Sequence, residues 1–326
     1  MAAPVLSVRD LGVEIPTRRA ALTALDGVSF DIAPGEVLGL VGESGAGKSI
    51  TAAAIIGLLE PPGRISGGEI RLQGERIDDL PERRMRRVRG KRIGTIFQDP
   101  LTSLDPLYRI GDQIVETIRT HLPMPESKAR EKAIGLLREV RIPAPEARFD
   151  AYPHQFSGGM RQRVVIALAL AADPALVIAD EPTTALDVSV QAQILSLLKR
   201  SCAERGTSIL LITHDMGVIA ETADRVAVMY AGRIAEIGPV RKVIRHPRHP
   251  YTEGLMASIP SIAGRTTRLA HIEGAMPRLD ATPPGCPFHP RCTMALPRCA
   301  RDRPALTADG EGEIACWLHH EEAAGG

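Results

Sequence analysis

A glycine-rich stretch contains the residues of this sequence that are best suited to bind phosphate. It fits the pattern G-x-x-x-x-G-K-[ST], and its members are Gly42, Glu43, Ser44, Gly45, Ala46, Gly47, Lys48 and Ser49. The glycines permit a tight loop whose backbone N–H groups point at phosphate oxygens, next to the positive end of the helix that follows. Lys48 is expected to reach the β- and γ-phosphates of a nucleotide, and the Ser49 hydroxyl to ligate Mg²⁺. An ordinary glycine-rich turn is the alternative, but the apolar strand before the stretch favours a nucleotide site.

Polar residues follow two apolar runs, at 176–179 and 208–213. The carboxyl end of a strand beside a phosphate loop is where a carboxylate that organises Mg²⁺ belongs, which assigns that role to Asp180. Glu181 is expected near the γ-phosphate, where it could orient or deprotonate the attacking water. His214 follows the second run, and we expect it to contact the γ-phosphate. A solvated turn and a structural histidine are the alternatives.

A second anion site is predicted where Ser157, Gly158 and Gly159 open a helix over 158–172. Such a turn offers free backbone N–H groups, a hydroxyl and the helix dipole. One nucleotide has one γ-phosphate, so a second site in the same chain is best explained if it serves the ATP of another protomer.

The run 156–163, Phe-Ser-Gly-Gly-Met-Arg-Gln-Arg, resembles the signature of the ABC ATPases. Three further positions fit that family in the expected order, and the resemblance implies a role for each. Gln98 is similar to the Q-loop glutamine, which contacts Mg²⁺ or the γ-phosphate. Asp187 is similar to the D-loop aspartate, and His214 to the switch histidine.

The runs 182–193, 249–252 and 285–292 resemble, more narrowly, the ATPase subunits of dipeptide and oligopeptide importers. The resemblance implies a peripheral protein at the cytoplasmic face of the inner membrane, which hydrolyses ATP to import peptides. Its partners would be two permease subunits, a second ATPase chain and, indirectly, an extracytoplasmic binding protein. Importers of nickel or other small solutes remain an alternative. A DNA-maintenance ATPase is a remote one, because no heptad run for a coiled coil separates Gln98 from Ser157.

Four of the five cysteines, Cys286, Cys292, Cys299 and Cys316, lie near the end of the chain. They lack the close C-x₂-C pairs of zinc ribbons, and four thiolates also suit an iron–sulfur cluster. The importer resemblance implies a [4Fe–4S] cluster in some members, so we expect that cluster first, with zinc or free thiols as alternatives. Because we assign the cysteines to a separate domain, we expect them not to affect nucleotide binding. Cys202 is expected to be a small core residue.

The composition excludes several classes of protein. The chain has 326 residues, 44% of them hydrophobic, and a formal net charge of +1, which suits a sizeable core but provides no bulk field for nucleic acid. No apolar run is long enough to span a membrane, and no signal peptide is visible. The basic run 83–92 lacks the interleaved aromatics of a nucleic-acid patch, so we expect a solvated face or one near lipid head groups.

Alternating strand and helix patterns predict an α/β fold with a parallel sheet. In full, we expect a P-loop ABC-type ATPase core with an antiparallel β edge, over 1–98 and 158–245. A helical subdomain would be inserted at 99–157, and a small cysteine-rich domain would follow at 246–326. Residues 64–97 are expected to form further strands. The residue that stacks on adenine stays unassigned.

Overall fold

The computed structural model describes residues 3–100, 102–184, 186–258 and 271–320. They fall into two compact units. The first unit combines Met1–Ser7, Asp31–Val37 and Arg71–Ile212, and the second combines Val8–Phe30, Leu38–Ile70 and Thr213–Gly326. The chain therefore passes between the two units several times. The domain boundaries expected from the sequence stay a prediction.

The first unit contains a parallel sheet with the strand order β6-β7-β8. Its strands are β6 (Ile93–Ile96), β7 (Leu176–Asp180) and β8 (Ser208–Thr213). Their continuous Val, Ile and Leu runs are buried along almost their whole length, as expected for strands that are covered on both faces. Asp180 pairs in register with Ile212, so the predicted acids lie at the carboxyl end of this sheet.

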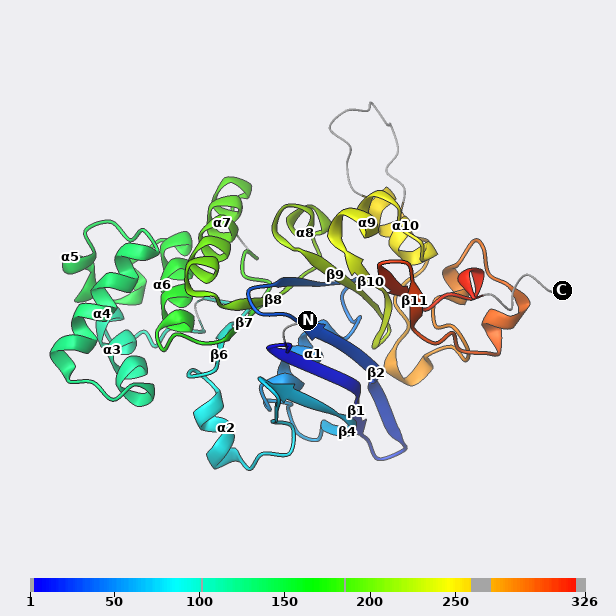
Figure 1. Ribbon diagram of the computed structural model, residues 1–326, viewed down its shortest axis with the longest axis horizontal. Coiled ribbons are helices and arrows are strands. Elements are labelled where there is room, and N and C mark those ends of the chain that lie inside the picture. The colour runs from blue at the N-terminus through cyan, green and yellow to red at the C-terminus, as the bar shows by residue number, and fades with distance from the viewer. Residues whose placement is uncertain (1–2, 101, 185, 259–270, 321–326) are drawn as a thin grey trace. The chain divides into compact units, whose positions relative to one another are not determined.

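The first unit also contains several helices (Figure 1). They are α2 (Glu82–Val88), α3 (Ile110–His121), α4 (Glu126–Glu139), α5 (Pro145–Phe149), η1 (Pro153–Gln155), α6 (Gly158–Leu170) and α7 (Val188–Arg205). The helical spacing predicted for 105–150 is confirmed, because Ile110, Ile114 and Ile118 are fully buried along one face of α3. On α7, Cys202 is buried in the core as expected, and burial raises the pKa of its thiol to about 12.

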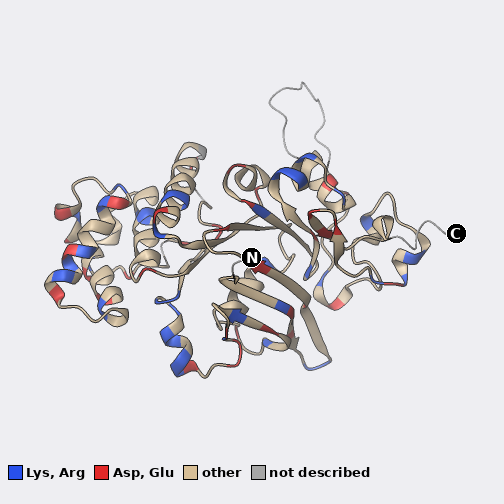
Figure 2. Cartoon of the chain, viewed as in Figure 1, with Lys and Arg blue, Asp and Glu red and all other residues tan. Residues whose placement is uncertain are grey.

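The basic run forms a helix, α2, where strands were predicted (Figure 2). Arginine, methionine and glutamate are good helix formers, and Met85 and Val88 are buried at a spacing of three residues. Glu82 accepts hydrogen bonds from Arg86 and Arg89, at 3.2 and 2.8 Å. The pKa of Glu82 is lowered to about 2, mainly through its hydrogen bond with Arg89. The other arginines of the helix are exposed, which confirms a solvated basic face.

The second unit contains a mixed sheet with the strand order β11-β12-β10-β9-β3. Its strands are β3 (Val37–Val41), β9 (Arg225–Tyr230), β10 (Arg233–Pro239), β11 (Thr307–Asp309) and β12 (Gly312–Ile314). β3 runs parallel to β9, whereas β9, β10, β12 and β11 alternate in direction. A second sheet has the order β2-β1-β4-β5, formed by β1 (Leu6–Pro16), β2 (Ala21–Ile32), β4 (Arg64–Leu72) and the short β5 (Glu75–Arg76). Most residues of β1, β2 and β4 belong to the second unit, and β5 belongs to the first.

The helices of the second unit are mostly short. They are α1 (Lys48–Ile55), α8 (Met216–Thr222), α9 (Val240–Arg245), α10 (Pro250–Ala257), η2 (Leu279–Ala281), η3 (His289–Arg291), η4 (Pro297–Ala300) and η5 (Trp317–His319). No helix in the described part of the chain is both long and apolar enough to cross a membrane.

The last described stretch, residues 271–320, is called the C-terminal segment below. It is rich in loops, as predicted, but the expected separate cysteine-rich domain is not supported. The hairpin of β11 and β12 extends the main sheet, with Ile314 paired to Glu236 of β10. Strand pairing of this kind depends on backbone groups far apart in the sequence, which composition does not reveal.

Candidate nucleotide site

The glycine-rich stretch, residues 42–49, forms a loop between β3 and α1 in the second unit; we call it the phosphate loop. Two of its glycines are required by the backbone. Gly42 has a φ of 153°, and a β-carbon there would lie 2.3 Å from the carbonyl oxygen of Met229. Gly47 has a φ of 107°, and a β-carbon there would lie 2.8 Å from Leu25. Because side chains are excluded, the loop backbone stays open to an anion at the start of α1.

Lys48 lies across the phosphate loop rather than in solvent. Only 7% of the surface of Lys48 is exposed. Its Nζ donates hydrogen bonds to the carbonyl oxygens of Gly42 and Glu43, at 2.8 and 3.1 Å. Ser49 follows on the first turn of α1 and is exposed. The ammonium group is thus already held at the loop, where the sequence pattern places a phosphate contact.

Gln98 and Glu181, which are 83 positions apart, meet in the first unit. The Gln98 Nε2 donates to the Glu181 Oε2 at 3.0 Å. Glu181 directly follows Asp180 at the end of β7, and its backbone N–H donates to the carbonyl oxygen of Ile212 at 2.9 Å. Its φ of 46° lies in the left-handed region, which is strained for a glutamate. Such strain often marks a functional position.

Thr184 completes this group, and the sequence analysis missed it. Its Oγ1 donates to the same Oε2 of Glu181 at 2.9 Å, and its backbone N–H donates to the Glu181 carbonyl oxygen at 3.2 Å. We call Gln98, Asp180, Glu181 and Thr184 the carboxylate cluster. A threonine three residues after the acid, within a turn, is the sequence signal that could have identified it.

The predicted second anion site is preformed at the start of α6. Ser157 is the N-cap of that helix, and its hydroxyl accepts a hydrogen bond from the Met160 N–H at 3.3 Å. A β-carbon at Gly159 would lie 2.9 Å from Val190 of α7, and one at Gly158 would lie 3.6 Å from Leu186. Asp187 is the N-cap residue of α7. The structure therefore brings Ser157, Gly158 and Gly159 next to the turn that holds Asp187.

His214 follows β8 directly, as predicted, and is exposed. The next residue, Asp215, caps α8 by accepting hydrogen bonds from the N–H groups of Gly217 and Val218, at 2.8 and 3.3 Å. The cap fixes the backbone just after the histidine, while its ring stays on the surface. Contact of His214 with a γ-phosphate stays a prediction.

The four cysteines of the C-terminal segment do not form a metal site. Within residues 3–100, 102–184, 186–258 and 271–320, no three or more His, Cys, Asp or Glu side chains are grouped so that they could hold a metal ion. Burial raises the pKa of the thiols of Cys286, Cys292 and Cys316, the last to about 11. The predicted iron–sulfur cluster is therefore not supported, and the geometry does not favour zinc either.

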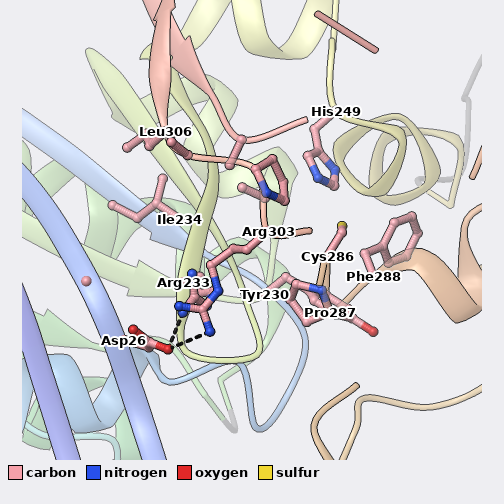
Figure 3. Close-up of a pocket in the computed structure, with 15 residues that line it drawn as sticks. Asp26, Tyr230, Arg233, Ile234, His249, Cys286, Pro287, Phe288, Arg303 and Leu306 are labelled. Carbon is pink, nitrogen blue, oxygen red and sulfur yellow. Dashed lines mark ion pairs between the residues drawn. The ribbon is translucent and has the colours of Figure 1, made fainter. Parts of the chain in front are cut away.

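Cys286 instead lines a cavity of about 300 Å³ in the second unit (Figure 3). At one end of this cavity, Arg303 forms an ion pair with Asp26 at 3.1 Å, and Arg233 pairs with the same carboxylate. Phe288 and Leu306 contribute apolar walls. The Cys286 thiol thus faces a partly apolar cavity, and Cys299 and Cys292 lie near enough to contribute to its raised pKa.

The comparisons with known proteins agree with this geometry. Residues 25–184 match the family described as ABC transporter, and residues 235–299 match the oligopeptide/dipeptide transporter C-terminal region. The dipeptide transport ATP-binding protein DppD of Bacillus subtilis is 46% identical over 98% of this chain and 96% of its own length. The oligopeptide transport ATP-binding protein OppD of Mycobacterium tuberculosis is 50% identical over 93% of this chain and half of its own length.

Solved structures show the same similarity. The ATP-binding cassette MJ0796, as a post-hydrolysis dimer bound to ADP and Pi, aligns with a TM-score of 0.65 and 27% identity, over 72% of this chain and 99% of its own. The protein cbiO1 of Clostridium perfringens, part of the complex cbiONQ, aligns with a TM-score of 0.65 and 28% identity, over 75% of this chain and 92% of its own.

Proposed function

The chain belongs to the ATP-binding subunits of ABC transporters, in the group that serves peptide import, and we propose that it couples ATP hydrolysis to the uptake of dipeptides or oligopeptides. The family resemblance and the ABC-type ATPase fold predicted from the motifs are thereby confirmed. The chain is an ATPase of this family. The observation that carries the proposal is the joint presence of an intact phosphate loop, the carboxylate cluster and the preformed start of α6 in a chain that matches peptide transport ATPases over nearly its whole length.

We propose that the phosphate loop and the carboxylate cluster both serve ATP hydrolysis. Lys48 would exchange its bonds to loop carbonyls for bonds to the β- and γ-phosphates, where its charge offsets the charge that develops in the transition state. Glu181 would orient the attacking water and accept its proton, while the bond between the γ-phosphorus and the bridging oxygen breaks to give ADP and phosphate. Gln98 and Thr184 would hold the Glu181 carboxylate in position.

The residues present fit Mg²⁺, which neutralises phosphate charge when bound. Ser49 offers an exposed hydroxyl at the phosphate loop, and Asp180 offers a carboxylate with a buried oxygen, Oδ1, at the end of β7. Together with the amide oxygen of Gln98, these are the hard oxygen ligands that Mg²⁺ prefers. We propose these three side chains as its ligands.

A second ATPase chain is the first proposed partner. Ser157, Gly158 and Gly159 lie at a helix start suited to an anion, and they would bind the γ-phosphate in the partner protomer. His214 and Asp187 would complete the same dimeric site. The dimeric state of MJ0796 supports this arrangement.

Permease subunits and an extracytoplasmic binding protein are the further partners that the importer group implies. The chain would then sit as a peripheral protein on the cytoplasmic face of the membrane. The names of the relatives support peptides as cargo, and no observation favours nickel or a DNA-maintenance role. No metal at the C-terminal cysteines enters this mechanism.

Reconstitution tests the proposed function. The chain is combined with its permeases and binding protein in vesicles, and ATP-dependent uptake of a labelled dipeptide is measured, with Lys48→Ala as the control. Uptake that stops in the control is the expected result. Uptake of nickel without any uptake of peptide would overturn the assignment of cargo.

A further inference from the structure

The side chain of Glu43, the second residue of the phosphate loop, is bound by the C-terminal segment. Arg291 donates from Nη1 and Nη2 to the two carboxylate oxygens of Glu43, at 2.7 and 3.0 Å. The two residues are 248 positions apart. Only 7% of the Arg291 side chain is exposed, against 29% for Glu43. A bidentate, charge-assisted hydrogen bond that is largely shielded from solvent is among the stronger polar contacts in proteins.

Arg291 is itself held firmly. Its Nε donates to the carbonyl oxygen of Glu273 at 2.8 Å, and its Nη2 donates to those of Ile272 and Gly274, at 3.3 and 3.4 Å. The planar guanidinium group therefore reaches Glu43 in a fixed orientation, which a flexible lysine could not reproduce.

The backbone of Glu43 is bound from the same side by Tyr251 of α10. The Glu43 N–H donates to the Tyr251 hydroxyl at 2.9 Å, and Tyr251 is fully buried. Its ring packs against those of Tyr230 and Phe288, with centroids 4.7 and 5.4 Å away. Both neighbours line the cavity of Figure 3. The hydroxyl is thus presented by a rigid aromatic cluster.

Glu43 also contacts Lys48, the lysine of the phosphate loop. The carbonyl oxygen of Glu43 accepts a hydrogen bond from the Lys48 Nζ, so the position of the Glu43 peptide helps to set the resting position of that ammonium group. Further along the loop, Met276 lies 3.7 Å from where a β-carbon of Gly45 would be. The C-terminal segment therefore contacts the phosphate loop at two places.

We propose that Arg291 and Tyr251 are positioning residues for the phosphate loop, which make the affinity for ATP depend on the C-terminal part of the chain. This inference rests on the proposed assignment of residues 42–49 as the ATP site. It differs from the expectation that the cysteine-bearing region does not affect nucleotide binding, because Arg291 directly precedes Cys292. A structural change in the C-terminal segment would therefore displace Glu43 of the phosphate loop through Arg291.

The test measures ATP binding by calorimetry, and the KM and kcat of ATP hydrolysis, on the full chain. Tyr251→Phe removes only the hydroxyl, and Arg291→Lys keeps the charge but loses the paired geometry. We expect each to raise the Kd and the KM for ATP by about 5-fold, with kcat nearly unchanged, since each loses one or two hydrogen bonds. Arg248→Lys is the control, because the Arg248 side chain donates to Asp309 and not to the loop.

A double-mutant cycle separates positioning from a general effect on folding. In a Glu43→Gln background, Arg291→Lys should change the affinity for ATP much less than in the natural chain, because the partner carboxylate is already gone. Unchanged ATP affinity in both folded single variants, or equal losses in both backgrounds, would overturn the proposal. Retained ATP binding in Lys48→Ala would instead count against the nucleotide site itself, so the two failures are distinguishable.

Discussion

The phosphate loop and the carboxylate cluster are held in opposite ways. The loop is fixed by glycine backbone geometry and by buried partners: Lys48 is 7% exposed and Tyr251 is fully buried. The carboxylate cluster is fixed by exposed side chains, since Gln98 and Thr184 reach Glu181 at the surface of the first unit. The difference suggests that ATP binding depends on a preorganised backbone, whereas the chemical step depends on exposed side chains that hold Glu181.

Removal of the lysine should have the largest effect on binding. In Lys48→Ala the direct phosphate contact is lost, and we expect ATP affinity to fall by roughly 100-fold or more, as for a charge-assisted contact in a shielded site. Calorimetric titration with Mg-ATP measures the loss. Near-native affinity would count against residues 42–49 as the nucleotide site.

A smaller effect is expected from Thr184→Val in the carboxylate cluster. The variant removes one hydrogen bond to Glu181, which is worth about 1 kcal/mol, so kcat should fall by roughly 5-fold while ATP affinity stays the same. Thr117→Val is the matched control, because the Thr117 hydroxyl bonds within α3, to the carbonyl oxygen of Gln113. A change in ATP affinity without a change in kcat would contradict the assignment of the carboxylate cluster to the chemical step.

Features that depend on a short local sequence pattern could be predicted from the sequence. The phosphate loop could be predicted because its function depends on a short local pattern, in which the glycines at 42 and 47 have no room for a side chain. The strand before Asp180 and the apolar face of α3 were predictable for the same reason, since their periodicity is local.

Contacts between distant positions could not be predicted in this way. The bond between Arg291 and Glu43 spans 248 positions, and the pairing of β12 with β10 joins strands separated by α9, α10 and most of the C-terminal segment. The cysteines show the opposite error. Their number suggested a cluster, but spacing alone does not tell whether four thiols take the geometry of a metal site, and no metal-binding group is found among the described residues.

A further prediction concerns stability rather than ATP affinity or turnover, at the helix that supports Tyr251. His249 caps α10 through its Nδ1, which accepts from the Tyr251 N–H at 3.0 Å. Burial lowers the pKa of His249 from 6.5 to about 4. The unfolded chain therefore binds a proton between pH 6.5 and 4 that the folded chain does not, so stability must fall as the pH falls through this window.

Linkage gives a loss of about 2 kcal/mol from pH 7 to pH 5 for such a shift. Urea unfolding at the two pH values measures this loss, and His249→Gln should flatten the dependence by about that amount. An identical pH dependence in the variant would show that other groups cause it.

The most direct test of the account is Glu181→Gln, which keeps the size and the hydrogen-bonding oxygen of the side chain but removes its ability to accept a proton. ATP turnover, Mg-ATP affinity and the mass of the assembly are measured on the same preparation. The account predicts near-native affinity, turnover reduced by roughly 100-fold or more, and a dimer that accumulates with ATP bound. Turnover close to that of the natural chain would contradict it, because Glu181 would then not handle the attacking water.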